Sequence, residues 1–196
     1  MAPNIFFTAD LHLGHSNIIK YCNRPFQTAD EMNAKLIGNW NNTISDKDEI
    51  YVVGDFAFMG TKNVEEILKH LRGRKYLVRG NHDKGLNETM ALKYFEWIKD
   101  YYILKVPEQN NQVQKIVLFH YALRTWDSAH YGAWNLYGHS HGNLKDDPES
   151  LSLDVGVDCH GYHPIVYEQV KEIMTRKNWK PKPDFDYSKE DTTKQS

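Results

Sequence analysis

Short apolar runs alternate along this chain with stretches of helical periodicity. The apolar runs span residues 5–8, 49–53, 75–78, 116–119, 135–137 and 151–157. Their length and their content of Val, Ile, Leu, Phe and Tyr are typical of buried strands, and the last run alternates apolar with polar positions. Residues 96–107 have a weaker pattern, in which Tyr101, Tyr102 and Ile103 favour a strand.

Three other stretches predict helices. Residues 29–43 follow Thr28 and carry Glu31 in the spacing of a capping box. Residues 63–70 have apolar positions at helical spacing, and residues 165–176 follow Pro164, which suits a first helical turn. This alternation predicts an α/β protein in which helices flank a central, largely buried sheet.

Polar residues directly follow five of the apolar runs. They are Asp10 and His12, Asp55, Asn81 and His82, His120, and His139 and His141. In α/β sheets, ligands bind beyond the carboxyl ends of the strands, so these side chains are expected to converge. One histidine in such a place is usually a hydrogen-bonded core residue, but five sites placed alike indicate one metal centre.

This set of donors favours a particular chemistry. Carboxylate oxygens and imidazole nitrogens suit manganese, which we expect, and also iron, zinc or nickel. Asp55 lies centrally in the series and is the natural residue to bridge two divalent ions. Two metals about 3.5–4 Å apart activate a bridging water and clamp a phosphoryl group, which predicts attack by a metal-bridged hydroxide. His82 follows Asn81 but is spaced differently from the ligands, so we assign it as the general acid.

The order of these motifs resembles one known group of enzymes. The segments DLHLGH, GDF, GNHD, a lone His after a strand, and GHSH resemble the calcineurin-like metallophosphoesterase superfamily over residues 10–141. The resemblance implies a four-layer α/β/β/α sandwich with a dinuclear metal site at the carboxyl ends of the strands. It implies that one metal is held by Asp10, His12, Asp55 and His141, and the other by Asp55, Asn81, His120 and His139. His82 matches the catalytic histidine, and the segment DLHLGHSNIIKYCNRPF resembles a small bacterial and phage-type branch.

The second motif departs from the pattern of the protein phosphatases in this superfamily. Those enzymes carry GDxxDRG, whereas residues 54–60 here read GDFAFMG and lack the Asp-Arg pair. A guanidinium fork is the usual partner of a dianionic terminal phosphate, so its absence favours phosphodiesters unless Arg24, Arg79 or Arg124 takes its place. We expect hydrolysis of a phosphodiester in a nucleotide-type small molecule.

Other functions stay open. A phosphomonoesterase for nucleotides, sugar phosphates or phosphoproteins is the main alternative. A nuclease and a non-catalytic scaffold are weaker alternatives, because the sequence has no basic stripe and keeps every ligand position.

Four further residues are candidates for substrate contact. Residues 121–134 connect His120 to His139 and are rich in residue types that stack on bases or bind phosphate, so Arg124 and His130 are candidates. His15 either touches substrate or supports His12. Arg24 lies in a segment that either folds over the rim of the site or forms a simple turn.

Composition places the chain among ordinary globular proteins. Its 196 residues, 40% hydrophobic, predict one domain over residues 1–179 and a polar tail over residues 180–196. A net charge of −2 without a long basic block argues against a stable nucleic-acid partner. Two distant cysteines and the lack of a signal or membrane-length segment favour a cytoplasmic enzyme with a small phosphoester substrate, without a membrane or stable protein partner.

Overall fold

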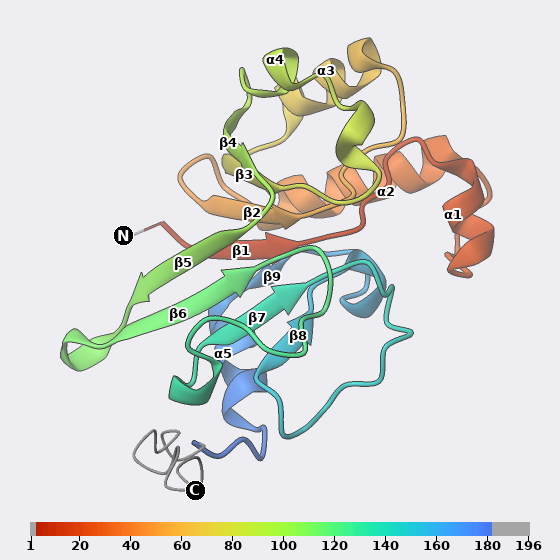
Figure 1. Cartoon of the computed structure of the whole chain (residues 1–196). Helices are drawn as coiled ribbons and strands as arrows, with labels where there is room; N and C mark the ends of the chain where they lie inside the picture. The colour runs from red at the N-terminus through yellow and green to blue at the C-terminus, as the bar shows by residue number, and fades with distance from the viewer. Residues whose placement is uncertain (1–2, 182–196) are drawn as a thin grey trace, which may run out of the picture.

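Two β-sheets form the centre of the molecule, which the computed structural model describes over residues 3–181 (Figure 1). The strands of the first sheet are β1 (Ile5–Thr8), β2 (Glu49–Val53), β3 (Arg74–Val78), β4 (Phe95–Lys99) and β9 (Ile165–Val166). The strands of the second sheet are β5 (Tyr102–Pro107), β6 (Val113–Leu118), β7 (Trp134–Tyr137) and β8 (Ser152–Asp154). Their orders are β4-β3-β2-β1-β9 and β5-β6-β7-β8.

Most strand pairs in both sheets are parallel. β1, β2, β3 and β4 pair in parallel, with Phe7 opposite Tyr51, whereas β9 runs antiparallel to β1. β6, β7 and β8 also pair in parallel, with Ile116 opposite Trp134, and β5 is antiparallel to β6. Because parallel strands end at the same edge of a sheet, the loops that follow β1, β2 and β3 gather together, as do those that follow β6 and β7.

Helices flank the pair of sheets on two sides. The helices are α1 (Ser16–Tyr21), α2 (Ala29–Thr43), α3 (Thr61–His70), α4 (Glu88–Ala91) and α5 (Tyr167–Thr175). The first four lie on one side of the pair of sheets, and α5 lies on the other side beside β8 and β9 (Figure 1). At the start of α2, the Thr28 side chain accepts a hydrogen bond of 3.2 Å from the Glu31 amide, as the capping-box pattern predicts.

Two apolar layers hold these elements together. In the outer layer, Leu36 and Trp40 of α2 and Leu68 of α3 pack on Ile50 and Val52 of the first sheet. The inner layer joins the two sheets and α5, and it includes Phe7, Val53, Leu104, Ile116, Leu136 and Val170. The predicted α/β class and the two sheets flanked by helices are therefore confirmed.

The structure corrects three boundaries predicted from the sequence. The helix expected from residue 165 begins at Tyr167, because Ile165 and Val166 pair with Phe7 and Phe6 as β9. Residues 96–107 contain two strands rather than one, and β4 and β5 belong to different sheets. The strand expected over residues 151–157 is limited to β8. The short helices α1 and α4 were not predicted, since one or two turns show little periodicity.

Asp48 fixes the turn that precedes β2. Its buried carboxylate accepts hydrogen bonds from the Ser45 amide (2.8 Å), the Ser45 hydroxyl (2.7 Å) and the Asn4 amide (2.9 Å). Burial by itself raises the pKa of this carboxyl, but the hydrogen bonds outweigh burial and lower the pKa. The carboxylate therefore stabilises the fold fully above the unfolded-state pKa of about 3.9, and this contribution is lost as pH falls through the lower folded-state pKa.

We expect Asp48→Ala to lower the free energy of unfolding by about 2 kcal/mol at pH 7, because two amides and a hydroxyl lose their acceptor. The difference from wild type should shrink at pH 3 and below, measured by urea unfolding. Asp46→Ala, which removes an exposed carboxylate from the same turn, should change little at either pH. An equal loss for Asp48→Ala at pH 7 and at low pH would contradict the assigned role of the charge.

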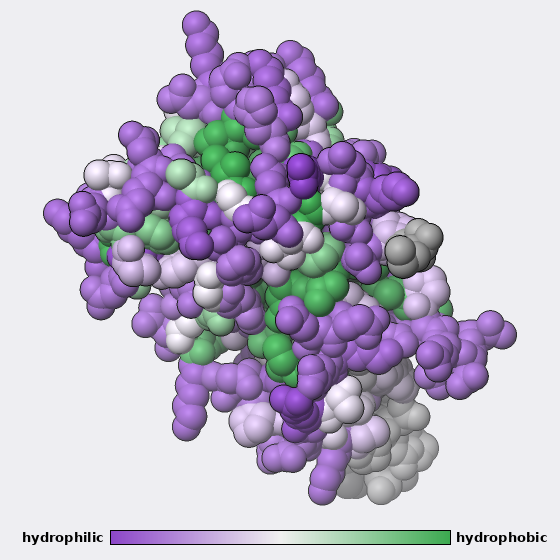
Figure 2. All heavy atoms as spheres, turned by 180° about the vertical axis from the view of Figure 1, so that it is seen from behind, coloured by the Kyte–Doolittle hydropathy of each residue, from purple (hydrophilic) through white to green (hydrophobic). Residues whose placement is uncertain are grey.

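The surface on the side opposite to that of Figure 1 is mostly hydrophilic, and its apolar side chains gather in small separate patches (Figure 2). Within residues 3–181, none of the helices combines the length and the apolar character needed to cross a membrane. The polar tail predicted for residues 180–196 lies almost entirely outside the described residues.

Candidate metal centre

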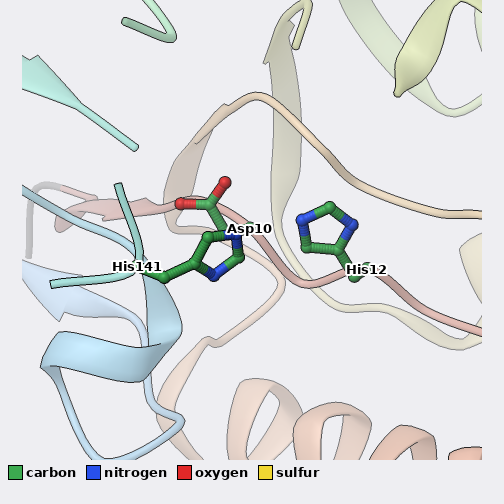
Figure 3. Close-up of side chains that lie close together, drawn as sticks. All are labelled: Asp10, His12 and His141. Atoms are coloured by element: carbon green, nitrogen blue, oxygen red, sulfur yellow. The ribbon is translucent and has the colours of Figure 1, made fainter. Parts of the chain in front are cut away.

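The polar residues that follow the strands converge where the two sheets meet. All seven predicted ligands lie here, on the loops after β1, β2, β3, β6 and β7. Six of them form two donor groups, Asp10 with His12 and His141, and Asp55 with His120 and His139. Within each group the donor atoms lie within 4.8 Å of one another. Figure 3 shows the first group, in which Asp10 and His12 share the segment after β1 and His141 approaches from a different loop.

Asp55 connects the two donor groups, and Asn81 lies beside one of them. The Asp55 Oδ2 atom lies 3.4 Å from Nε2 of His12 in the first group and 3.4 Å from Nε2 of His120 in the second. The Asn81 Oδ1 atom lies 3.0 Å from His120 Nε2 and 3.0 Å from His139 Nδ1. Asp55 is thus placed to serve both groups, and Asn81 belongs with the second.

Burial and neighbouring charges shift the pKa values of several donors. Both ring nitrogens of His12 are buried without a hydrogen-bond partner, and burial lowers the pKa of this imidazole to about 3, which leaves a neutral ring. Burial raises the pKa of Asp10 to about 7. Burial also acts to raise the pKa of Asp55, but the neighbouring His120 outweighs it and lowers that pKa to about 2. A neutral imidazole without partners beside buried carboxyl oxygens is the donor set that a divalent metal needs.

The backbone of the site is strained. Asp10, His12, Asp55, His139 and His141 have φ values of 56°, 50°, 55°, 67° and 48°, in the left-handed region. This conformation costs roughly 1–2 kcal/mol for each residue that is not glycine. Strain of this kind persists where the surrounding structure enforces it, and it is concentrated at functional sites.

Two glycines allow the donors to approach each other. A Cβ atom on Gly54 would lie 2.1 Å from Nδ1 of His120, and Gly54 itself has a φ of +94°. A Cβ atom on Gly80 would lie 2.1 Å from Oδ1 of Asp55. The glycines that precede Asp55 and Asn81 are therefore required by the close packing of the ligands.

The match with known sequences agrees with this geometry. Residues 3–160 match the sequence pattern of the calcineurin-like phosphoesterases. The chain belongs to this family. It is therefore a metal-dependent phosphoesterase, a hydrolase of phosphoric esters, and its two donor groups fit the dinuclear centre typical of the family.

Relatives of the phosphoesterase span nearly its whole length. It is 31% identical over 179 residues to an uncharacterized protein of Methanocaldococcus jannaschii, with 88% of this chain and 92% of the relative covered. It is 24% identical over 193 residues to the Gene 66 protein of Mycobacterium phage D29, with 87% and 96% covered. The crystal structure of a protein of unknown function from Aquifex aeolicus has a TM-score of 0.66 at 21% identity and covers 87% of this chain and 99% of its own. That structure supports the fold assignment.

His82 and His15 lie on the same side of the phosphoesterase's metal centre. The ring centroid of His82 is 5.2 Å from that of His12 and 5.9 Å from that of His15. The His82 amide donates a hydrogen bond of 2.9 Å to Asp55 Oδ1, which fixes the backbone of His82 beside the centre. His15 is half-buried, and burial lowers its pKa. The structure thus brings both residues to the site predicted for them.

Two supporting carboxylates were not identified from the sequence. Asp83 accepts hydrogen bonds from the amides of Asp55 (2.8 Å), Phe56 (2.9 Å) and Gly80 (2.8 Å), and so ties the loops after β2 and β3 together. Asp158 lies with its Oδ2 atom 2.7 Å from Nδ1 of His141, which orients that ring. Asp83 is the last residue of the third motif, GNHD, which was a usable signal, whereas Asp158 lies outside every motif.

Arg24 is not on the rim of the site, which corrects its predicted placement as a substrate contact. Its side chain has no exposed surface and forms two hydrogen bonds of 2.8 Å with the carboxylate of Asp158. The same guanidinium donates to the carbonyl oxygens of Asp10 (2.7 Å) and Leu11 (3.1 Å). Arg24 therefore lies behind the ligands, where it holds Asp158 and the ligand-bearing loop after β1.

Arg124 and His130 are also placed away from the metal centre. Both line a separate cavity of about 810 Å³ together with Leu151 and Trp179. His130 lies in the short helical turn Ala129–Tyr131 that leads into β7, and Leu151 immediately precedes β8, so this cavity lies at the amino ends of these strands. The metal ligands His139 and His141 follow the carboxyl end of β7. The predicted contact of Arg124 and His130 with a substrate at the metals is thus corrected.

Proposed function

We propose that this phosphoesterase hydrolyses phosphodiesters of nucleotide-type small molecules, with manganese as its metal. The observation that supports this assignment is that the three candidate arginines already make other contacts or lie away from the metal centre. Arg24 is bound to Asp158, Arg79 is paired with Glu88 and Asp100, and Arg124 lines the cavity at the amino ends of β7 and β8. None of the three arginines that could replace the missing Asp-Arg pair is available to clamp a dianion. A diester carries one negative charge and needs less clamping than a monoester.

The residues of the site have different roles. Asp10, His12, Asp55 and His141 would hold one divalent ion, and Asp55, Asn81, His120 and His139 would hold the other. When bound, such ions supply a nucleophile from water at neutral pH and neutralise charge that develops on the phosphoryl oxygens.

His82 is the residue assigned to the leaving group. Its ring lies beside that of His12 but belongs to neither donor group, so its nitrogens are not needed as ligands. From this place it donates a proton to the leaving oxygen as the bond to phosphorus breaks. Asp83 keeps His82 in place indirectly, because it binds the Gly80 amide at the start of the same loop.

We expect the manganese-loaded protein to hydrolyse bis-p-nitrophenyl phosphate with a kcat/KM at least about tenfold above that for p-nitrophenyl phosphate, because none of Arg24, Arg79 and Arg124 is free to meet the second charge of the monoester. Removal of the metals with a chelator should abolish both activities, and added Mn²⁺ should restore them. A preference for the monoester would overturn the assignment to diesters and favour a phosphomonoesterase.

A further inference from the structure

A cavity of about 330 Å³ opens beside His82. Phe58, Met59 and Leu86 form much of its wall, and Thr61 and Asn87 contribute polar but uncharged groups. Apart from His82, none of the residues that line this cavity has an ionisable side chain. Its volume is at the lower end of the roughly 300–1,000 Å³ found for ligand pockets, which is room for one ring system rather than a whole dinucleotide.

Phe58 connects this cavity to the metal centre. This residue is 52% exposed, although its side chain is large and apolar. Its ring meets the ring of His82 edge-on, with the centroids 5.7 Å apart and an interplanar angle of 81°. It also lies 4.6 Å from the ring of His15. An exposed aromatic ring held between two histidines of the site offers a surface on which a planar group can stack.

We propose that this cavity is the leaving-group subsite and that it takes an uncharged aromatic group, such as an aryl ring or the base of a nucleoside. This inference rests on the proposed function and specifies its substrate. In hydrolysis, the oxygen of water bonds to phosphorus, and the bond from phosphorus to the leaving oxygen breaks with its electron pair on that oxygen. The proton from His82 then completes the departing alcohol. An alcohol that receives its proton from His82 must depart beside His82, and the cavity is the space available there.

The lining of the cavity selects against a charged leaving group. A di- or triphosphate in this position would lose its water without gaining a cation, because no Lys or Arg among residues 3–181 lines the cavity. An aromatic ring would instead bury apolar surface against Phe58 and Leu86. The cavity therefore favours neutral nucleosides or aryl alcohols as departing groups over nucleotides that carry further phosphates.

Phe58→Ala tests the subsite with two manganese-dependent substrates, bis-p-nitrophenyl phosphate and methyl p-nitrophenyl phosphate. Both release p-nitrophenol, but only the first retains an aromatic arm on phosphorus. If Phe58 contacts the leaving group, kcat/KM falls about five- to tenfold for both substrates, as expected for the loss of one aromatic contact. A loss confined to bis-p-nitrophenyl phosphate would assign Phe58 to the retained arm and overturn the proposal.

Tyr131→Ala is the matched control, because it removes another exposed aromatic ring, just before β7 at the far end of the second sheet. It should leave both rates unchanged. Calorimetry adds a readout independent of turnover: phenylphosphonate should bind the wild-type protein about fivefold more tightly than methylphosphonate does, and Phe58→Ala should remove this difference. If the wild-type protein hydrolyses both diesters and Phe58→Ala has the same rates, the subsite assignment is wrong and the proposed function stands. A wild-type protein that hydrolyses neither diester overturns the proposed function and the subsite with it.

Discussion

Asp55→Asn and His82→Ala should each lower kcat for hydrolysis of a phenyl diester by at least about a hundredfold, but only Asp55→Asn should lower the metal content. Asp55 lies 3.4 Å from a ring nitrogen of each donor group, so the loss of its charge weakens both. The His82 side chain belongs to neither group. Its backbone amide, which binds Asp55, is kept in His82→Ala. Metal analysis of the purified variants beside their steady-state rates would separate the two roles.

The leaving group provides a sharper test of His82. p-Nitrophenolate departs with little need of a proton, whereas phenolate needs one, so His82→Ala should impair phenyl esters more strongly than p-nitrophenyl esters. His70→Ala, which removes an exposed histidine at the end of α3, is the matched control and should leave all rates unchanged. Equal impairment of both ester types would argue that His82 acts by some means other than proton donation.

Three strands of the first sheet, β1, β2 and β3, could be predicted closely because of how they are buried. β1 and β2 have the bounds expected from their apolar runs, since strands covered on both faces need apolar residues at successive positions. The convergence of the seven ligands followed from the same reasoning. Once the strands are parallel, the residues after their carboxyl ends meet at one edge.

The positions of residues outside the strands depend on tertiary structure, which the local sequence pattern does not reveal. The segment after His120 was expected near the metals because ligands lie at both of its ends. β6 and β7 are parallel, however, so this segment must return to the amino end of β7 before the next strand begins. That return carries His130 to the opposite end of the sheet. The parallel pairing of β6 and β7, had it been known, would have predicted this outcome.

The position of Arg24 could not be predicted from the strand pattern at all. It follows α1, a helix of six residues with no clear periodicity, and its partner Asp158 lies 134 positions away in the sequence. An arginine near the first motif has two plausible uses, contact with a substrate phosphate or support of a ligand. Only the packing of the loop around residue 158 against the first motif decides between them.

Arg24→Met should lower the free energy of unfolding by about 3–5 kcal/mol and weaken metal binding about 10- to 100-fold. The substitution keeps most of the side-chain volume but leaves the buried Asp158 carboxylate without its cation. The carbonyl oxygens of Asp10 and Leu11 also lose their donor, so the loop that carries Asp10 and His12 is loosened. Urea unfolding of the metal-free protein and titration with Mn²⁺ would measure the two effects.

Two variants separate support of the ligands from contact with substrate. Arg24→Lys keeps the charge but not the paired hydrogen bonds to Asp158, so its stability and metal affinity should lie between those of wild type and Arg24→Met. Arg79→Met removes a partly exposed arginine that pairs with Glu88 and Asp100, and it should cost less than about 1 kcal/mol. If Arg24 contacted substrate instead, Arg24→Met would raise KM while stability and metal affinity stayed at wild-type values. Because the guanidinium is enclosed by Asp158 and two backbone carbonyls, we expect the opposite result, with stability and metal affinity lost together.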